Sequence, residues 1–160
     1  MATEVSTMEH PPYPLLSRFL APPTCFDEEA IRCSVEGKVV LVSGASYGVG
    51  RALALKLGRS GARLLLLART TEKLNELKEE LGHGVEVFPI DLRDPEAIDI
   101  VGRELAARNP DIVVHNAGKS IKRSLHDSLD RAHDFERTMG VNYLGPVRLQ
   151  LALLPSMIES

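Results

Sequence analysis

The chain alternates short apolar runs with segments in which apolar side chains recur every three or four positions. The runs at 38–44, 63–68, 85–90 and 111–118 are nearly continuous and rich in valine, leucine or isoleucine, which is typical of strands buried on both faces. Between these runs, three segments have the periodicity of amphipathic helices. Their apolar positions are Val49, Leu53 and Leu57, then Leu74, Leu77 and Leu81, then Ile98, Val101 and Leu105.

Local signals mark where the helices begin and end. Gly82 closes a helix predicted over 70–81, and Asp94 and Pro95 supply an N-cap and a first-turn proline for the next helix. A longer helical stretch is predicted from about 130 to 154. Strands and helices that alternate in units of this length require right-handed crossovers. The pattern therefore predicts an α/β fold with a doubly wound parallel sheet.

The first 34 residues differ in composition from the rest of the chain. Residues 1–24 contain five of the ten prolines, which predicts an extended N-terminal segment outside the packed domain. A short helix is predicted at 27–32, and the domain is predicted to occupy 35–160. The apolar side chains within 13–20 either lie over this domain or form a docking or membrane-contacting element.

Composition narrows the classes of function. The chain has 160 residues, of which 44% are hydrophobic and 26% charged, enough for one domain with a sizeable core. The formal net charge of -3 provides no basic stripe, so nucleic-acid binding is not expected. No transmembrane segment or secretory signal is evident, which predicts a cytoplasmic protein, either free or peripheral to a membrane. Cys25 and Cys33 are interpreted as ordinary thiols in a reducing compartment.

A glycine-rich turn lies between the first predicted strand and the first predicted helix. In a parallel α/β sheet this turn lies at the carboxyl edge, where ligands bind. Gly44, Gly48 and Gly50 let a pyrophosphate approach the backbone, and the helix N-terminus offers free N–H groups. Ser43 and Ser46 add hydroxyl groups. The turn therefore predicts a site for the phosphates of a dinucleotide.

Four motifs follow one another along the chain: Ser43-Gly44-x-x-x-Gly48-x-Gly50, Asp91-Leu92, His115-Asn116-Ala117-Gly118, and Asn142 within GVNYLG. In this order they resemble the short-chain dehydrogenase/reductase family. The resemblance covers about 37–160 and implies a Rossmann-type sheet that is incomplete on its C-terminal side. His115 departs from the pattern, because the family more often has asparagine there.

The resemblance implies a role for each motif. The glycine turn holds the pyrophosphate, Asp91 contacts the adenine, and Asn142 supports a proton-relay water. Two alternatives come from the residues themselves: Asp91 caps the turn before the next helix, or Asn142 relieves strain in a helix interrupted by Gly145 and Pro146. The cofactor-binding residues implied are Ser43, Gly44, Ser46, Tyr47, Gly48, Val49, Gly50, Asp91, Leu92, Asn116, Ala117 and Gly118.

The residue after the second strand bears on the choice between NAD(H) and NADP(H). An acidic residue about twenty positions after the glycine turn accepts the ribose hydroxyls of NAD and repels the 2′-phosphate of NADP. Arg69 occupies this position, and a guanidinium pairs with a phosphate through two charge-assisted hydrogen bonds. NADP(H) is therefore favoured over NAD(H). The alternative is a surface arginine at a helix start, and Tyr47 adds no second basic group at the turn.

A second cluster of polar residues precedes the last helical stretch. His126 and His133 lie among Asp127, Asp130 and Asp134, a composition that suits a metal site. The favoured interpretation is a solvated helix face. No metal is predicted.

Residues 116–158 and the segment LLLARTTEKL at 65–74 resemble the fatty acyl-CoA reductase branch of the family. This resemblance implies reduction of a long-chain acyl-CoA to the aldehyde with NADPH. A 3-ketosphinganine reductase-like enzyme is the alternative, and a homo-oligomer is expected if the chain is complete. The basic side chains Lys119, Lys122, Arg123 and Arg131 either attract the phosphates of coenzyme A or form a mixed-charge surface.

The family's catalytic serine, tyrosine and lysine are not found in this sequence. In the family the serine polarises a carbonyl, and a lysine four residues after the tyrosine lowers the pKa of that proton donor. Tyr13, Tyr47 and Tyr143 are followed four positions later by Ser17, Arg51 and Val147, so there is no YxxxK. Three hypotheses follow: part of a reductase, a non-catalytic dinucleotide-binding or interaction protein, or a truncated, nonfunctional product. If the chain ends at Ser160, the fourth strand and the last helix are expected to expose apolar surface unless another chain covers it.

Overall fold

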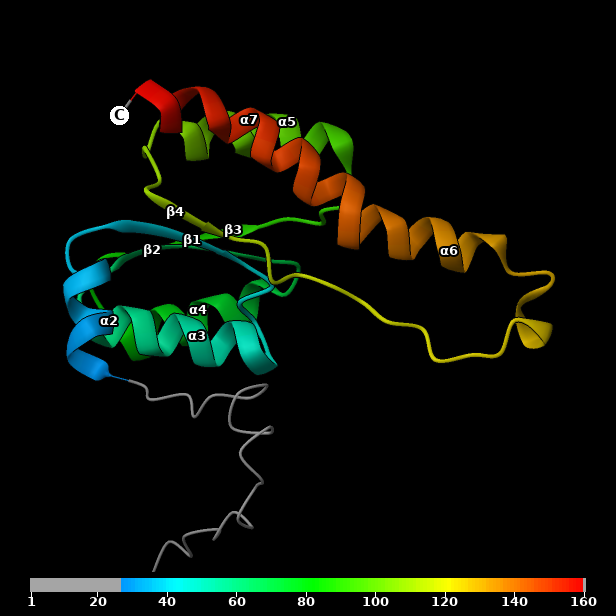
Figure 1. The fold of residues 1–160 in the computed structure, drawn as a ribbon, viewed down its shortest axis with the longest axis horizontal. Helices are drawn as coiled ribbons and strands as arrows, with labels where there is room; N and C mark the ends of the chain where they lie inside the picture. Colours follow the sequence, from blue (N-terminus) through cyan, green and yellow to red (C-terminus); the bar gives the residue numbers. More distant parts are fainter. Residues whose placement is uncertain (1–26, 160) are drawn as a thin grey trace, which may run out of the picture.

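A four-stranded parallel sheet forms the centre of the computed structural model, which describes residues 27–159 (Figure 1). The strand order is β3-β2-β1-β4, and Val42 of β1 lies opposite Leu66 of β2 and Val114 of β4. This topology confirms the predicted doubly wound α/β class. The strands are β1 (Val39–Ser43), β2 (Arg63–Ala68), β3 (Val85–Pro89) and β4 (Ile112–Val114).

Helices cover both faces of the sheet (Figure 1). On one face lie α2 (Glu28–Val35), α3 (Gly48–Arg59) and α4 (Thr71–Leu81); on the other lie α5 (Pro95–Ala106) and α7 (Gly145–Glu159). Successive strand residues point to opposite faces, so Val40 and Leu64 join the core under α3 and α4, whereas Leu41 and Leu65 join the core under α5 and α7. Burial on both faces explains why β1 and β2 are continuous apolar runs.

The first described helix is longer than the sequence predicts. Asp27 caps α2 by accepting hydrogen bonds from the backbone N–H groups of Glu29 and Ala30, and the helix continues to Val35. Val35 is buried in the core beneath α3 and α4. The predicted domain boundary at residue 34 therefore falls within a helix that packs on the domain. The predictions for residues 1–26 lie outside the described residues.

The last helical stretch consists of three elements instead of one helix. After the 3₁₀ turn η1 (His126–Ser128), α6 (Ala132–Met139) leads into the π-helical segment η2 (Gly140–Leu144) and then into α7. The segment between β4 and α6, drawn in yellow, extends away from the sheet (Figure 1).

The helix α7 is fixed to α5 and leaves one apolar face exposed. Leu149 and Leu153 are fully buried, and the guanidinium of Arg148 donates two hydrogen bonds of 2.8 Å to Asp99 of α5. Leu151 is 65% exposed, and Val147 and Leu154 are also exposed. These side chains are the apolar surface that the sequence predicts for this helix. None of the helices within 27–159 combines the length and apolar character needed to cross a membrane.

Candidate functional site

A cavity of about 380 Å³ lies at the carboxyl edge of the sheet. Its walls come from 44–49 after β1, 67–69 at the end of β2, 90–93 after β3 and 116–119 after β4. Ligands of open α/β sheets bind at this edge, and pockets of this size accept small molecules. The predicted site residues that line it are Gly44, Ser46, Tyr47, Val49, Arg69, Asp91, Leu92, Asn116, Ala117 and Gly118.

Two glycines let the first turn, α3 and the end of β4 approach one another closely. Gly44 has φ +70°, and a Cβ there would lie 2.8 Å from the Cα of Ala117. Gly50 is buried, and a Cβ there would lie 2.3 Å from the carbonyl oxygen of Gly44 and 2.4 Å from Nδ2 of Asn116. Neither Gly48, at the start of α3, nor Gly50 lines the cavity. Gly50 therefore acts through packing in this structure.

Ser43 holds the turn to β4 instead of facing the cavity. Its hydroxyl is fully buried, accepts hydrogen bonds from the backbone N–H groups of Asn116 (3.1 Å) and Ala117 (3.0 Å), and donates to the carbonyl of Val114 (3.4 Å). The Asn116 side chain in turn donates to the carbonyls of Ser43 (3.0 Å) and Gly44 (3.2 Å). The prediction that the Ser43 hydroxyl donates to a phosphate is therefore wrong, because its hydrogen bonds are used within the fold.

The N-terminus of α3 is built differently from those of α2 and α5. Asp27 and Asp94 cap α2 and α5 with side-chain carboxylates, whereas Tyr47 makes no capping hydrogen bond to α3. The backbone N–H groups of the first turn of α3 thus have no side-chain acceptor among the described residues. Such a terminus, together with the close backbone at Gly44, fits an anion such as a phosphate.

Val49 lies on the exposed side of this helix. The sequence places it on the apolar face with Leu53 and Leu57, but Val49 is 76% exposed and lines the cavity, while Ala54 is fully buried. The helical periodicity correctly predicts that Leu57 is buried, but its prediction that Val49 is buried is wrong. Its position in the first turn puts Val49 beside the strand ends, beyond the body of the sheet.

Asp91 lines the cavity and also caps its own turn. Its Oδ1 accepts a 3.0 Å hydrogen bond from the backbone N–H of Arg93, and the Arg93 guanidinium binds both carboxylate oxygens. These hydrogen bonds hold the pKa of Asp91 below its ordinary value, against the opposing effect of partial burial. The charge of Arg69 lowers this pKa further. Asp91 therefore caps its turn, as the alternative interpretation proposed, and it also lies in the cavity wall.

Asn142 fixes the chain just after β4. From η2, its Oδ1 accepts a 2.8 Å hydrogen bond from the backbone N–H of Lys119, and its Nδ2 donates a 2.9 Å hydrogen bond to the carbonyl of Lys119. Asn142 is outside the cavity wall. Its support of a proton-relay water stays a prediction. The alternative role, relief of strain in the helix interrupted by Gly145 and Pro146, also stays a prediction, and Asn142 lies in the π-helical segment just before these two residues.

A family model described as "short chain dehydrogenase" matches residues 38–160. The chain belongs to the short-chain dehydrogenase/reductase family. The four motifs that carry the resemblance all lie in the matched residues, and their spatial convergence agrees with it.

Several members of the family are similar over most of this chain. A fatty acyl-CoA reductase of Acinetobacter baylyi is 47% identical over 137 residues, covering 82% of this chain and 46% of the relative. A fatty acyl-CoA reductase of Mycobacterium tuberculosis is 40% identical over 128 residues, covering 77% of this chain and 44% of the relative. A metagenomic short-chain oxidoreductase in complex with NADP superposes with a TM-score of 0.72 at 35% identity, covering 79% of this chain and 59% of that one. The chain thus spans less than half the length of these two reductases.

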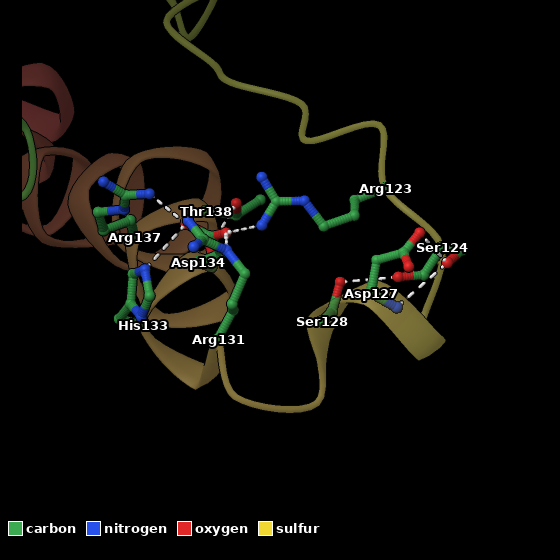
Figure 2. A network of polar contacts seen from close by, with 9 residues as sticks. All are labelled: Arg123, Ser124, Asp127, Ser128, Arg131, His133, Asp134, Arg137 and Thr138. Carbon is green, nitrogen blue, oxygen red and sulfur yellow. Dashed lines mark hydrogen bonds and ion pairs between the residues drawn. The ribbon is translucent and has the colours of Figure 1, made fainter.

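A buried carboxylate organises the segment before α6 in this short-chain dehydrogenase/reductase chain (Figure 2). Asp134 is only 5% exposed, and Arg131 Nε and Arg123 Nη1 approach its Oδ2 at 2.8 and 3.1 Å. Arg137 donates to the other oxygen, and His133 Nε2 lies 3.4 Å from it. The predicted solvated face is therefore wrong for Asp134, because three arginines surround it.

The histidine and aspartate cluster does not assemble around a common point. The side chain of His126 is 91% exposed and lies 3.8 Å from Asp127, on η1. Within the described part of the chain, no three His, Cys, Asp or Glu side chains are grouped as metal ligands. The guanidinium of Arg137 links Asp134 to the cavity, whose wall includes Arg137.

The Asp134 network predicts a pH-dependent stability. Burial raises the pKa of the Asp134 carboxyl, but the Arg137 hydrogen bond and the nearby positive charges outweigh it, so the pKa lies below its ordinary value. The carboxylate therefore stabilises the fold above about pH 4, and this contribution is lost as the pH falls through the lowered pKa. We expect Asp134→Asn to lower Tm at pH 7 and to have a much smaller effect near pH 2.5, measured by thermal unfolding followed by circular dichroism.

The matched control is Asp130→Asn, an exposed aspartate in the same segment. It is expected to leave Tm nearly unchanged at both pH values. If Asp134→Asn lowers Tm by the same amount at pH 2.5 and at pH 7, the Asp134 carboxylate does not stabilise the fold through its charge.

Some cavity residues are absent from the predicted site. Arg93 follows Asp91 by two positions, and this Asp-x-Arg spacing is a local signal for an ion pair. Lys119, considered in the sequence only for coenzyme A phosphates, and Arg137 reach the cavity through the path of the chain after β4. The apolar wall residues that were not predicted are Leu67, Ala68, Ile90 and Val141.

Proposed function

We propose that this chain is the NADP(H)-binding part of an oxidoreductase that reduces an acyl-CoA or another lipid-like carbonyl compound. The observation that carries the proposal is Arg69, which lies in the wall of the cavity formed by the glycine turn and the uncapped N-terminus of α3. Two relatives named fatty acyl-CoA reductase and a structural neighbour in complex with NADP support it. We further propose that the protein works in the cytoplasm or at a membrane surface.

The residues of the cavity fit such a cofactor. The backbone at 44–49 and the first turn of α3 would receive the phosphates, because their N–H groups have no side-chain cap. Asp91 would lie toward the adenine and Arg69 toward the 2′-phosphate, while 116–118 would line the remainder of the site. When bound, NADPH supplies the hydride for carbonyl reduction. Asn142 would hold the backbone at Lys119 in position beside it.

Replacing Arg69 is expected to weaken NADPH binding selectively. Arg69→Ala removes a charge-assisted contact to the 2′-phosphate, a group that NADH lacks, so the Kd for NADPH should rise about 10- to 100-fold. The Kd for NADH should change by less than about threefold. Both constants can be measured by titrating the purified protein and following the fluorescence of the reduced nicotinamide.

The control is Arg63→Ala, which removes an exposed arginine from the opposite end of the same strand. It should leave both constants unchanged. If Arg69→Ala weakened NADPH and NADH equally, or neither, Arg69 would not recognise the 2′-phosphate.

The substrate class is tested on the full-length oxidoreductase of which this chain is proposed to be the cofactor-binding part, by following NADPH oxidation with a long-chain acyl-CoA and, separately, with a long-chain 3-keto compound. Oxidation with the acyl-CoA supports the proposed function. Oxidation with the keto compound alone favours a 3-ketosphinganine reductase-like enzyme. Saturable NADPH binding with no oxidation by either compound favours a non-catalytic dinucleotide-binding protein.

A further inference from the structure

A carboxylate lies in the same cavity wall as the arginine proposed to bind a phosphate. Asp91 and Arg69 both line the cavity, at the ends of neighbouring strands β3 and β2. The side chain of Asp91 is 31% exposed. A carboxylate near a bound phosphate repels it. Unless its charge is neutralised, the Asp91 carboxylate would therefore weaken the binding of a phosphate at Arg69.

Arg93 neutralises this carboxylate in a fixed geometry. Its Nε donates to both oxygens of Asp91 at 3.0 Å, its Nη2 donates to Oδ2, and its backbone N–H donates to Oδ1 at 3.0 Å. The backbone N–H of Asp94 also donates to the carbonyl of Asp91 at 3.0 Å, which closes the turn. Asp91 and Arg93 belong to the same turn, so the backbone of that turn fixes their distance.

The pairing leaves a net positive charge on the group formed by Arg69, Asp91 and Arg93. The charges of Asp91 and Arg93 cancel, so the positive charge of Arg69 is left for a ligand. Asp91 is ionised at neutral pH, since its pKa is lowered by the Arg93 hydrogen bonds and by Arg69. Without Arg93, the carboxylate would face Arg69 and compete with a phosphate for its guanidinium.

We propose that Arg93 is a specificity-determining residue, which favours NADP(H) over NAD(H) by neutralising Asp91 in the cavity wall. This inference rests on the proposed NADP(H)-binding function. It assigns the selectivity to a pair of residues after β3 in addition to Arg69 at the end of β2. Arg93 acts on the cofactor through Asp91, and its effect therefore depends on the presence of that carboxylate.

The test compares the Kd for NADPH and for NADH in wild type, Arg93→Ala, Asp91→Asn and the double variant. Arg93→Ala should lower the preference for NADPH about tenfold, because it exposes a negative charge near the 2′-phosphate. Asp91→Asn in the same chain should return the preference to within about threefold of wild type. Any contact between Asp91 and the adenine is common to both cofactors, so it cancels in the ratio of the Kd for NADH to the Kd for NADPH.

Two further variants separate charge from structure. Arg93→Lys keeps the positive charge and should retain most of the preference, and Arg63→Ala should retain all of it. Thermal unfolding followed by circular dichroism identifies any variant that is not folded at the titration temperature. If Arg93→Ala is not folded, Arg93→Gln, which removes the charge and keeps most of the side chain, supplies the same test together with its Asp91→Asn double variant.

The outcomes distinguish this inference from the proposed function. A wild-type protein with no preference for NADPH overturns both. A wild-type preference that Arg93→Ala leaves intact overturns the inference alone. A preference that Arg93→Ala lowers and Asp91→Asn does not restore means that Arg93 binds the phosphate directly, which overturns neutralisation of Asp91 as the mechanism.

Discussion

Gly50→Ala is expected to destabilise the fold by about 3 kcal/mol or more and to abolish cofactor binding. A Cβ at residue 50 would lie 2.3 Å from the carbonyl oxygen of Gly44 and 2.4 Å from Nδ2 of Asn116. Both of these atoms belong to rigidly held groups: the first is backbone, and the second is hydrogen bonded to the carbonyls of Ser43 and Gly44. The methyl group therefore fits only if α3 moves away from the turn, which changes the wall of the cavity.

Gly58→Ala is the matched control within the same helix. Its Cβ would meet only the ends of leucine side chains, Leu81 Cδ2 at 2.8 Å and Leu64 Cδ1 at 3.2 Å. These side chains can shift, and alanine is favoured over glycine in a helix by about 1 kcal/mol. Urea unfolding and NADPH titration of both variants measure the difference. If Gly50→Ala and Gly58→Ala lower the free energy of unfolding and weaken NADPH binding equally, close packing at the turn is not the cause of the Gly50→Ala effect.

Ser43→Ala is expected to destabilise the protein by roughly 1–3 kcal/mol, because it leaves the part-buried Ala117 N–H without an acceptor and removes one of the two acceptors of the Asn116 N–H. The hydroxyl of Ser43 accepts from Asn116 and Ala117, and after its removal the Asn116 N–H keeps only its 3.1 Å hydrogen bond to the carbonyl of Val114. The same loss loosens the contact between the end of β4 and β1, which the Asn116 side chain still holds. Urea unfolding gives the free energy, and hydrogen exchange at the Asn116 and Ala117 amides should become faster.

Ser46→Ala is the control for this prediction. Ser46 lines the cavity and is more exposed than Ser43, so its replacement should change stability by less than about 0.5 kcal/mol. Under the proposed function, it should weaken NADPH binding instead. A stable Ser43→Ala variant with weakened NADPH binding would restore the original prediction that the Ser43 hydroxyl serves a phosphate.

The local chemistry of the turns could be predicted to different extents. The Asp94 cap is correct in detail, since its carboxylate accepts from the N–H groups of Glu96 and Ala97, residues within three positions of it. The Asp91–Arg93 pair is equally local, and its spacing is visible in the sequence. The hydroxyl of Ser43, in contrast, has its partners more than 70 positions away, and only the pairing of β1 with β4 brings them together.

The sequence by itself determined the parallel α/β class, the position of the glycine turn and most helix faces. These features depend on the periodicity of apolar side chains and on residues within one turn of each other. Tertiary structure alone decided that Val49 faces the cavity, that Ser43 points to β4 and that Arg123 reaches the buried Asp134, whose other two arginine partners are three positions away. In each case the environment of the side chain comes from a segment distant in sequence or from the end of an element, where periodicity no longer specifies which side faces the core.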